Sequence, residues 1–173
     1  MTSAEANDVT EIQQLIYRYA WAIDHREFAL LDKVFAPDAR IHYNVVGGSQ
    51  MPYAQLRDWL GTSLQIFRVT QHGMLNPMIE VSGDRARSRT YGSLMHVQER
   101  RDGSQNFVVQ YATYFDELAR TPPGWRVTSR RLDNMWIQGQ FLLAPGELKL
   151  FPTPEFGLEG QPAGGPSSTT IQA

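Results

Sequence analysis

Four long segments of alternating polarity, separated by short turn sequences, dominate the chain after residue 68. They span residues 69–81, 85–99, 105–118 and 125–139. The sequences between them are Ser82-Gly83-Asp84, Arg101-Asp102-Gly103 and Thr121-Pro122-Pro123-Gly124, which have the composition of tight turns. Alternation of apolar and polar residues is typical of a strand with one buried face. The pattern therefore predicts a meander of long antiparallel strands that needs a cover.

The first third of the chain has helical periodicity and can supply that cover. The buried stripe of the first predicted helix consists of Ile12, Leu15, Ile16, Tyr19 and Ile23. A second helical run covers residues 27–35 and is stopped by Pro37. A short strand is predicted over 39–46, and Pro52 opens a third helix. Helices followed by a meander predict an α+β domain: a cone of curved antiparallel sheet, covered by N-terminal helices, with an apolar interior suited to a small molecule.

The chain of 173 residues is long enough for one domain, which we expect to span residues 1–156. Residues 157–173 are rich in Pro, Gly, Ser and Thr, and this composition predicts a disordered tail. The segments 141–143 and 148–151 are too apolar to stand in water alone. We expect them to wrap around the domain or a neighbouring subunit.

Charge and composition narrow the classes of partner. Sixteen Lys and Arg against eighteen Asp and Glu give a net charge of −2, which argues against nucleic acid. The absence of cysteine excludes disulfides, thiolate metal sites and cysteine nucleophiles. No apolar run approaches the ~20 residues that span a bilayer, and residues 1–10 do not resemble a signal peptide. We therefore expect a cytoplasmic protein with no membrane partner.

The four histidines, His25, His42, His72 and His96, are the side chains that titrate nearest neutrality. His72 lies within the first predicted long strand and His96 within the second. They stand 11 and 13 residues from the turn at Gly83, so the two could be neighbours across a hairpin. A role in acid–base chemistry is one interpretation. An ordinary hydrogen-bonded histidine in the core or on the surface is the other.

Asp24 follows the apolar stripe of the first helix and could lie at the mouth of the cone. On a helical projection it is about 120° from Ile12, so only a bend or a helix end would turn it inward. The run Asp24-His25-Arg26-Glu27 also has the form of a capping box for the next helix. From spacing alone, the capping interpretation is slightly favoured.

Other polar and aromatic side chains could line the same cavity. The candidates are Tyr19, Tyr43, Asn134 and Trp136, each of which needs a hydrogen-bond partner when buried. The chain has no H-x-H or H-E-x-x-H spacing, so no metal site is predicted. It also lacks a glycine-rich phosphate loop, and its glycines fall in turns.

Three stretches together resemble the SnoaL-like branch of the nuclear-transport-factor-2-like (NTF2-like) superfamily. Residues 11–24 and 28–40 are similar to the opening of that family, and the run from Gly124-Trp125-Arg126-Val127 to Asn134-Met135-Trp136 is similar to its last strand. The resemblance covers about residues 8 to 140. It implies an α+β cone and a homo-oligomer, either a trimer or a dimer.

Within that family the chain looks most like the lyases scytalone dehydratase, bile acid 7α-dehydratase and hexachlorocyclohexane dehydrochlorinase, which use an Asp–His pair. Asp24 and His72, 48 residues apart, match the positions of that pair. Tyr19 looks like a tyrosine of the bile acid enzymes. Tyr43 and His96 look like further site residues of scytalone dehydratase.

The resemblance implies a cofactor-independent elimination on a small hydroxylated cyclic or polyketide-like substrate, without a metal. His72 would be the base, and Asp24 would orient it. Ile23 stands where scytalone dehydratase has a tyrosine, which argues against scytalone itself. An isomerase or polyketide cyclase, a small subunit of a ring-hydroxylating dioxygenase, and a non-catalytic small-ligand-binding or assembly module are the alternatives.

Overall fold

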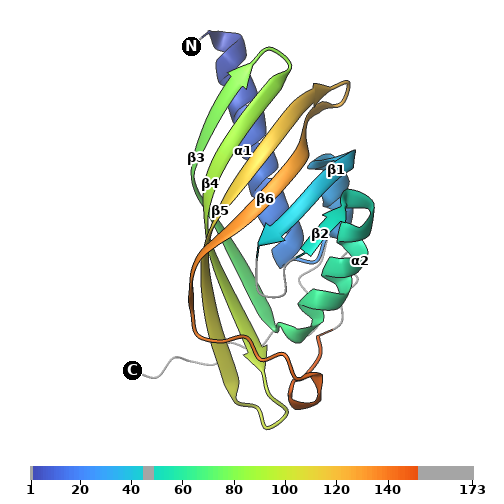
Figure 1. The fold of residues 1–173 in the computed structure, drawn as a ribbon, viewed down its shortest axis with the longest axis vertical. Helices are drawn as coiled ribbons and strands as arrows, with labels where there is room; N and C mark the ends of the chain where they lie inside the picture. Colours follow the sequence, from blue (N-terminus) through green and yellow to red (C-terminus); the bar gives the residue numbers. More distant parts are fainter. Residues whose placement is uncertain (1, 45–48, 152–173) are drawn as a thin grey trace.

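A long N-terminal helix lies against a curved six-stranded sheet (Figure 1). The computed structural model describes residues 2–44 and 49–151. The strands are β1 (Phe35–Asn44), β2 (Ser49–Pro52), β3 (Val69–Ser82), β4 (Arg85–Glu99), β5 (Gln105–Thr121) and β6 (Gly124–Gln138). Their order across the sheet is β2-β1-β6-β5-β4-β3, and all neighbours are antiparallel except β1 and β6, which are parallel. The predicted α+β class and the meander of four long strands are confirmed.

The helices are α1 (Ser3–Asp24) and α2 (Tyr53–Ser63), with the short 3-10 helices η1 (Phe28–Lys33), η2 (Leu64–Ile66) and η3 (Pro145–Glu147). Helix α1 begins at a capping box, in which the Thr2 hydroxyl accepts from the Glu5 backbone N–H and the Glu5 carboxylate accepts from the Thr2 N–H. The predicted apolar stripe of α1 is buried, with Ile12 and Ile16 fully so. It packs on the sheet and closes one side of the core.

The predicted helix over 27–35 is wrong. Residues 28–33 form only the short η1, and Phe35 already begins β1. Pro37 does not stop a helix; it lies in β1, between the pairs Phe35–Val127 and Arg40–Ser129, where the register of β1 against β6 is irregular. A proline is tolerated there because it has no backbone N–H to offer a regular ladder.

An ion pair is enclosed where α1 crosses the inner face of the sheet. Arg130 of β6 donates from Nε and Nη2 to the two carboxylate oxygens of Asp116 on β5, both at 2.7 Å, and both side chains are fully buried. The guanidinium carbon lies 4.1 Å from the centre of the Tyr19 ring of α1. The pair therefore links two strands to the helix that covers them.

The segment after β6 crosses the end of the sheet, and residues 139–151 are called the strap below. The Gln98 side chain binds Leu142 as a strand would: it donates to the Leu142 carbonyl and accepts from the Leu142 N–H, each at 2.9 Å. Leu148 is buried and bridges to Arg100. The expectation that these residues wrap around the domain holds for Leu142 and Leu148, whereas Leu143 and Leu150 are more than half exposed.

Some expectations fall outside the described residues. These are the disordered tail over 157–173, the domain end at 156, the last two residues of the strand predicted over 39–46, and the glycines that follow it. Within the described part of the chain, no helix combines the length and the hydropathy needed to cross a membrane.

The buried ion pair gives a prediction for stability. Replacing Asp116 with Ala leaves the Arg130 charge buried and unpaired, which should lower the free energy of unfolding by about 3–5 kcal/mol. The double substitution Arg130→Met with Asp116→Leu removes both charges and should recover most of that loss. Urea unfolding measures both effects.

The matched control is Glu117→Ala, which removes one partner of the exposed pair with Arg87. It should leave the free energy of unfolding nearly unchanged, because exposed ion pairs contribute little. A double variant as unstable as Asp116→Ala would contradict this account of the pair.

Candidate active site

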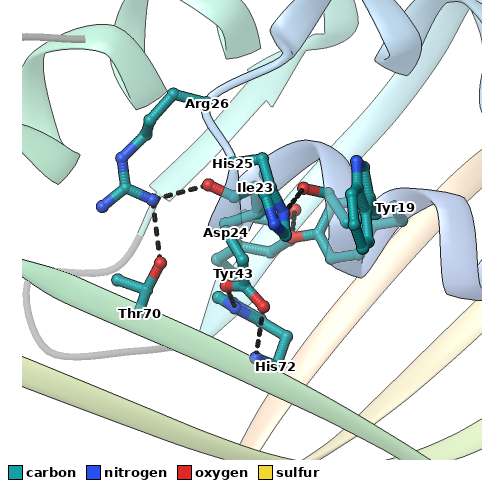
Figure 2. A network of polar contacts seen from close by, with 9 residues as sticks. Tyr19, Ile23, Asp24, His25, Arg26, Tyr43, Thr70 and His72 are labelled. Atoms are coloured by element: carbon teal, nitrogen blue, oxygen red, sulfur yellow. Dashed lines mark hydrogen bonds and ion pairs between the residues drawn. The ribbon is translucent and has the colours of Figure 1, made fainter. Parts of the chain in front are cut away.

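A carboxylate at the end of α1 contacts a histidine on the edge strand of the sheet (Figure 2). Asp24 Oδ2 accepts from the His72 backbone N–H at 2.7 Å, and Oδ1 accepts from His72 Nδ1 at 2.6 Å. The His72 side chain is 7% exposed and that of Asp24 is 14% exposed. The predicted contact between these two residues is confirmed.

This contact decides which ring nitrogen of His72 is free. A carboxylate can only accept a hydrogen bond, so Nδ1 carries the hydrogen. When the ring is neutral, Nε2 therefore carries no hydrogen and has a free lone pair. The same arrangement orients the base in catalytic Asp–His pairs. His72 can therefore accept a proton at Nε2 while Asp24 stabilises the imidazolium that forms.

Arg26 holds the end of α1 beside β3. Its Nη1 donates to the Ile23 carbonyl at 2.5 Å and to the Thr70 hydroxyl at 2.8 Å (Figure 2). Arg26 adopts a left-handed backbone with φ of 61°, which reverses the chain after the helix. Burial lowers the pKa of Arg26, and the negative charge of Asp24 opposes that shift.

The capping interpretation of Asp24 is wrong. Glu27 is the residue that precedes η1, and no side chain caps that short helix. Asp24 is the last residue of α1. It turns inward because the helix ends there.

Two phenols lie beside the Asp–His pair. The hydroxyls of Tyr19 and Tyr43 are 2.9 Å apart, and both side chains are buried. Burial raises the pKa of each phenol, and the positive charge of Arg130 opposes the shift without cancelling it. Both therefore stay protonated near neutral pH and can donate hydrogen bonds.

His96 is a neutral histidine. Its ring centre lies 6.1 Å from that of His72 and is packed against Phe67 and Phe141. Burial is the main reason that the pKa of His96 is lowered to about 3, and the nearby His72 lowers it further. His96 Nδ1 is buried without a hydrogen-bond partner among the described residues. The other two histidines lie elsewhere: His25 stacks on Trp21, and His42 is exposed on β1.

These side chains share a cavity of about 200 Å³. Tyr19, Tyr43, His72 and His96 line it, as predicted, and Asp24 contacts it through His72. Its apolar wall comes from α1, β1, α2, η2, the sheet and the strap, including Ile23, Trp59, Leu64, Phe67, Leu94, Leu132, Phe141 and Leu143. The site therefore combines two imidazoles, three phenols (Tyr19, Tyr43 and Tyr114) and a largely apolar surface.

Asn134 and Trp136 do not line this cavity, so their predicted place in it is wrong. The register of β6 against β5 shifts between the pairs Tyr111–Trp136 and Ala112–Asn134. Trp136 is 58% exposed and stacks on Tyr111, and Asn134 is also exposed. A bulge moves the side chains that follow it to the opposite face, which accounts for Trp136 but not for Asn134, since Asn134 precedes the shift and pairs with the buried Ala112. The sequence contains no pattern that indicates this bulge.

Sequence reasoning also missed several residues of the site. Arg26 beside the Asp–His pair, Gln110 and Tyr114 in the cavity wall and Arg130 beneath Tyr19 were not among the candidates. The alternation of β5 places Gln110 on the same face as Val108 and Ala112. A polar residue between Val108 and Ala112 on the buried face was the available signal.

Metal ligands do not gather in the described part of the chain: no three His, Asp or Glu side chains there could hold one ion. The groups present can bind, orient and move protons. They suit acid–base chemistry on a small organic molecule.

Comparison with known proteins identifies the family. Residues 4–131 match the model of the SnoaL-like domain, and the chain belongs to that family. A similar relative is an uncharacterized protein of Mycobacterium tuberculosis, 38% identical over 132 residues, which are 75% of this chain and 87% of that protein. The recognised resemblance is thus confirmed at the level of the family.

Solved structures share the fold. A protein from Kribbella flavida aligns with a TM-score of 0.71 and 26% identity over 78% of this chain and 95% of its own. A hexachlorocyclohexane dehydrochlorinase aligns with a TM-score of 0.65 and 20% identity over 82% of this chain and 97% of its own. Proteins of the NTF2-like superfamily are among the other structural neighbours, and the fold is NTF2-like.

The depressed pKa of His96 predicts a pH dependence of stability. Between pH 6.5 and about 3 the unfolded chain binds a proton at residue 96 that the folded protein does not. The free energy of unfolding should therefore fall as the pH falls through this window, by at most about 1.4 kcal/mol per pH unit from this group. Chemical unfolding at a series of pH values should show a shallower decline for His96→Leu. Equal slopes in the two proteins would contradict the assignment, since the other titrating groups are common to both.

Proposed function

We propose that this protein is a cofactor-independent lyase that eliminates water from a small hydroxylated cyclic or polyketide-like ketone. The observation that carries the proposal is the pair of contacts from Asp24 to His72, at 2.6 and 2.7 Å, at the wall of an apolar cavity. A bare Nε2 beside a ligand carbon is placed to act as a base. The similarity in fold to a dehydrochlorinase, which also carries out an elimination, supports the same class of reaction.

The proposed reaction begins with transfer of a proton from carbon to nitrogen. His72 Nε2 takes a proton from the carbon next to the carbonyl group, and the C–H electron pair moves into an enolate. Asp24 stabilises the imidazolium, and weak screening in the apolar cavity strengthens that attraction. No metal or organic cofactor is needed for this step.

Loss of the hydroxyl group completes the elimination. The electron pair of the enolate forms the new C=C bond while the C–O bond to the β carbon breaks. The Tyr19–Tyr43 pair donates a proton to the departing oxygen, so that water leaves. The proton held by His72 then returns to the phenolate, which restores the site.

The test follows elimination from β-hydroxy cyclic ketones, beginning with 3-hydroxycyclohexanone, by the ultraviolet absorbance of the conjugated enone. The wild-type protein should accelerate the reaction. His72→Gln and Asp24→Asn should each lower kcat by about 100-fold or more, because a positioned base contributes about that much. His42→Gln, on the exposed face of β1, is the matched control and should keep wild-type activity.

The outcomes separate this function from its alternatives. Undiminished turnover by His72→Gln would refute the proposed base. Exchange of the α hydrogen with solvent deuterium, without elimination from any of the β-hydroxy cyclic ketones tested, would indicate an isomerase or a cyclase. Binding without exchange would indicate a non-catalytic ligand-binding module.

A further inference from the structure

Two of the unpartnered polar atoms in the interior belong to the wall of the cavity. Five buried side-chain atoms lack a hydrogen-bond partner among the described residues: those of Ser88, Thr90, His96, Gln110 and Arg130. Only His96 and Gln110 line the cavity. Arg130 Nη1 is surrounded by aromatic rings, so its charge has an evident environment. The Gln110 amide nitrogen has no hydrogen-bond partner among the described residues to account for its burial.

An unused amide donor in this place is costly. Gln110 is 5% exposed, and leaving a buried donor unpaired destabilises the folded state. An apolar residue of the same size would avoid that cost, as Leu94 and Leu132 do on the neighbouring strands. A ligand oxygen would satisfy the donor.

The register of the sheet places Gln110 in line with the base. His72 on β3 pairs with Leu94 on β4, and Leu94 pairs with Gln110 on β5. Adjacent strands are about 4.8 Å apart, so the Cα atoms of His72 and Gln110 are separated by roughly 10 Å, with Leu94 between them. A ring that lies over Leu94 can reach both side chains.

The size and charge of the cavity restrict what that ring can be. About 150 Å³ suffices for benzene in an apolar protein cavity, so the 200 Å³ here accommodate one or two fused rings. Among the described residues of the wall there is no lysine or arginine. A carboxylate would have no cation to meet it, whereas a carbonyl oxygen needs only a donor.

We propose that Gln110 is a ligand-binding residue, whose side-chain amide donates a hydrogen bond to the carbonyl oxygen of an uncharged cyclic ketone lying over Leu94. This inference rests on the proposed function, because it places the carbon beside that carbonyl toward His72. It deepens that function by naming the substrate class: neutral ketones of one or two rings, with acids excluded.

The test compares ligands that differ only in the oxygen. Isothermal titration calorimetry with 2-indanone and indane should show that the wild-type protein binds the ketone about tenfold more tightly. Gln110→Leu keeps the volume of the side chain and removes the donor. It should lose this preference, bind indane at least as well as the wild type, and unfold at no lower temperature. Gln105→Leu, the same change at the exposed start of β5, should bind both ligands as the wild type does.

Three results would overturn the proposal. They are an unchanged preference for the ketone in Gln110→Leu, no preference for the ketone in the wild type (including no binding at all), and tighter binding of indane-2-carboxylate than of 2-indanone. Deuterium exchange at the α carbons of 2-indanone tests the proposed base separately. His72→Gln should bind the ketone but not catalyse exchange. If ketone binding depends on Gln110 and the wild type catalyses no exchange, the binding site stands and the lyase function fails.

Discussion

The edge strand of the sheet is held by a carboxylate. β3 is the strand at the edge of the sheet, next to β4. The backbone N–H of His72 donates a hydrogen bond to Asp24 and not to a neighbouring strand. The second oxygen of that carboxylate holds the ring of the same residue. One side chain therefore satisfies an edge amide, attaches the end of α1 to the sheet and selects the imidazole tautomer. Two hydrogen bonds from one carboxylate thus link the end of the helix, the edge of the sheet and the imidazole of the site.

Tyr19 lies between two carboxylate contacts, Asp116 with Arg130 and Asp24 with His72. The Tyr19 ring lies 4.1 Å from the guanidinium of Arg130 and 6.3 Å from the ring of His72. Arg130 is neutralised by Asp116, and His72 faces Asp24. A neutral ligand has no charge that would compete for either carboxylate, so it enters without breaking the Arg130–Asp116 ion pair or the contact between Asp24 and the neutral His72 ring. In the proposed reaction, the charge that forms on His72 has the Asp24 carboxylate as its counter-ion.

Sequence patterns predicted the long strands because four runs of alternation met clear turns. They failed where one residue changed the outcome. Pro37 indicated the end of a helix but lies in an irregular stretch of β1, and the bulge in β6 removed Trp136 from the inner face. Asp24 was the hardest case, since the helical projection pointed it away from the core. Only the resemblance to a family favoured its contact with His72, because spacing alone does not tell where a helix ends.

Gln110 shows why the rest of the site was not accessible from one sequence. Its importance depends on a row of side chains, His72, Leu94 and Gln110, that crosses three strands. Such a row can be identified only when the register of two strand pairs is known. Under the proposed binding mode, the same row also determines which rings fit the cavity. The distance between His72 and Gln110 is determined by the spacing of strands, which varies little between sheets. Leu94 lies between them, so its size decides how closely a ring can approach the base. A substitution at Leu94, in the middle of the row, should therefore change which rings fit between His72 and Gln110. Such a substitution needs no rearrangement of the backbone.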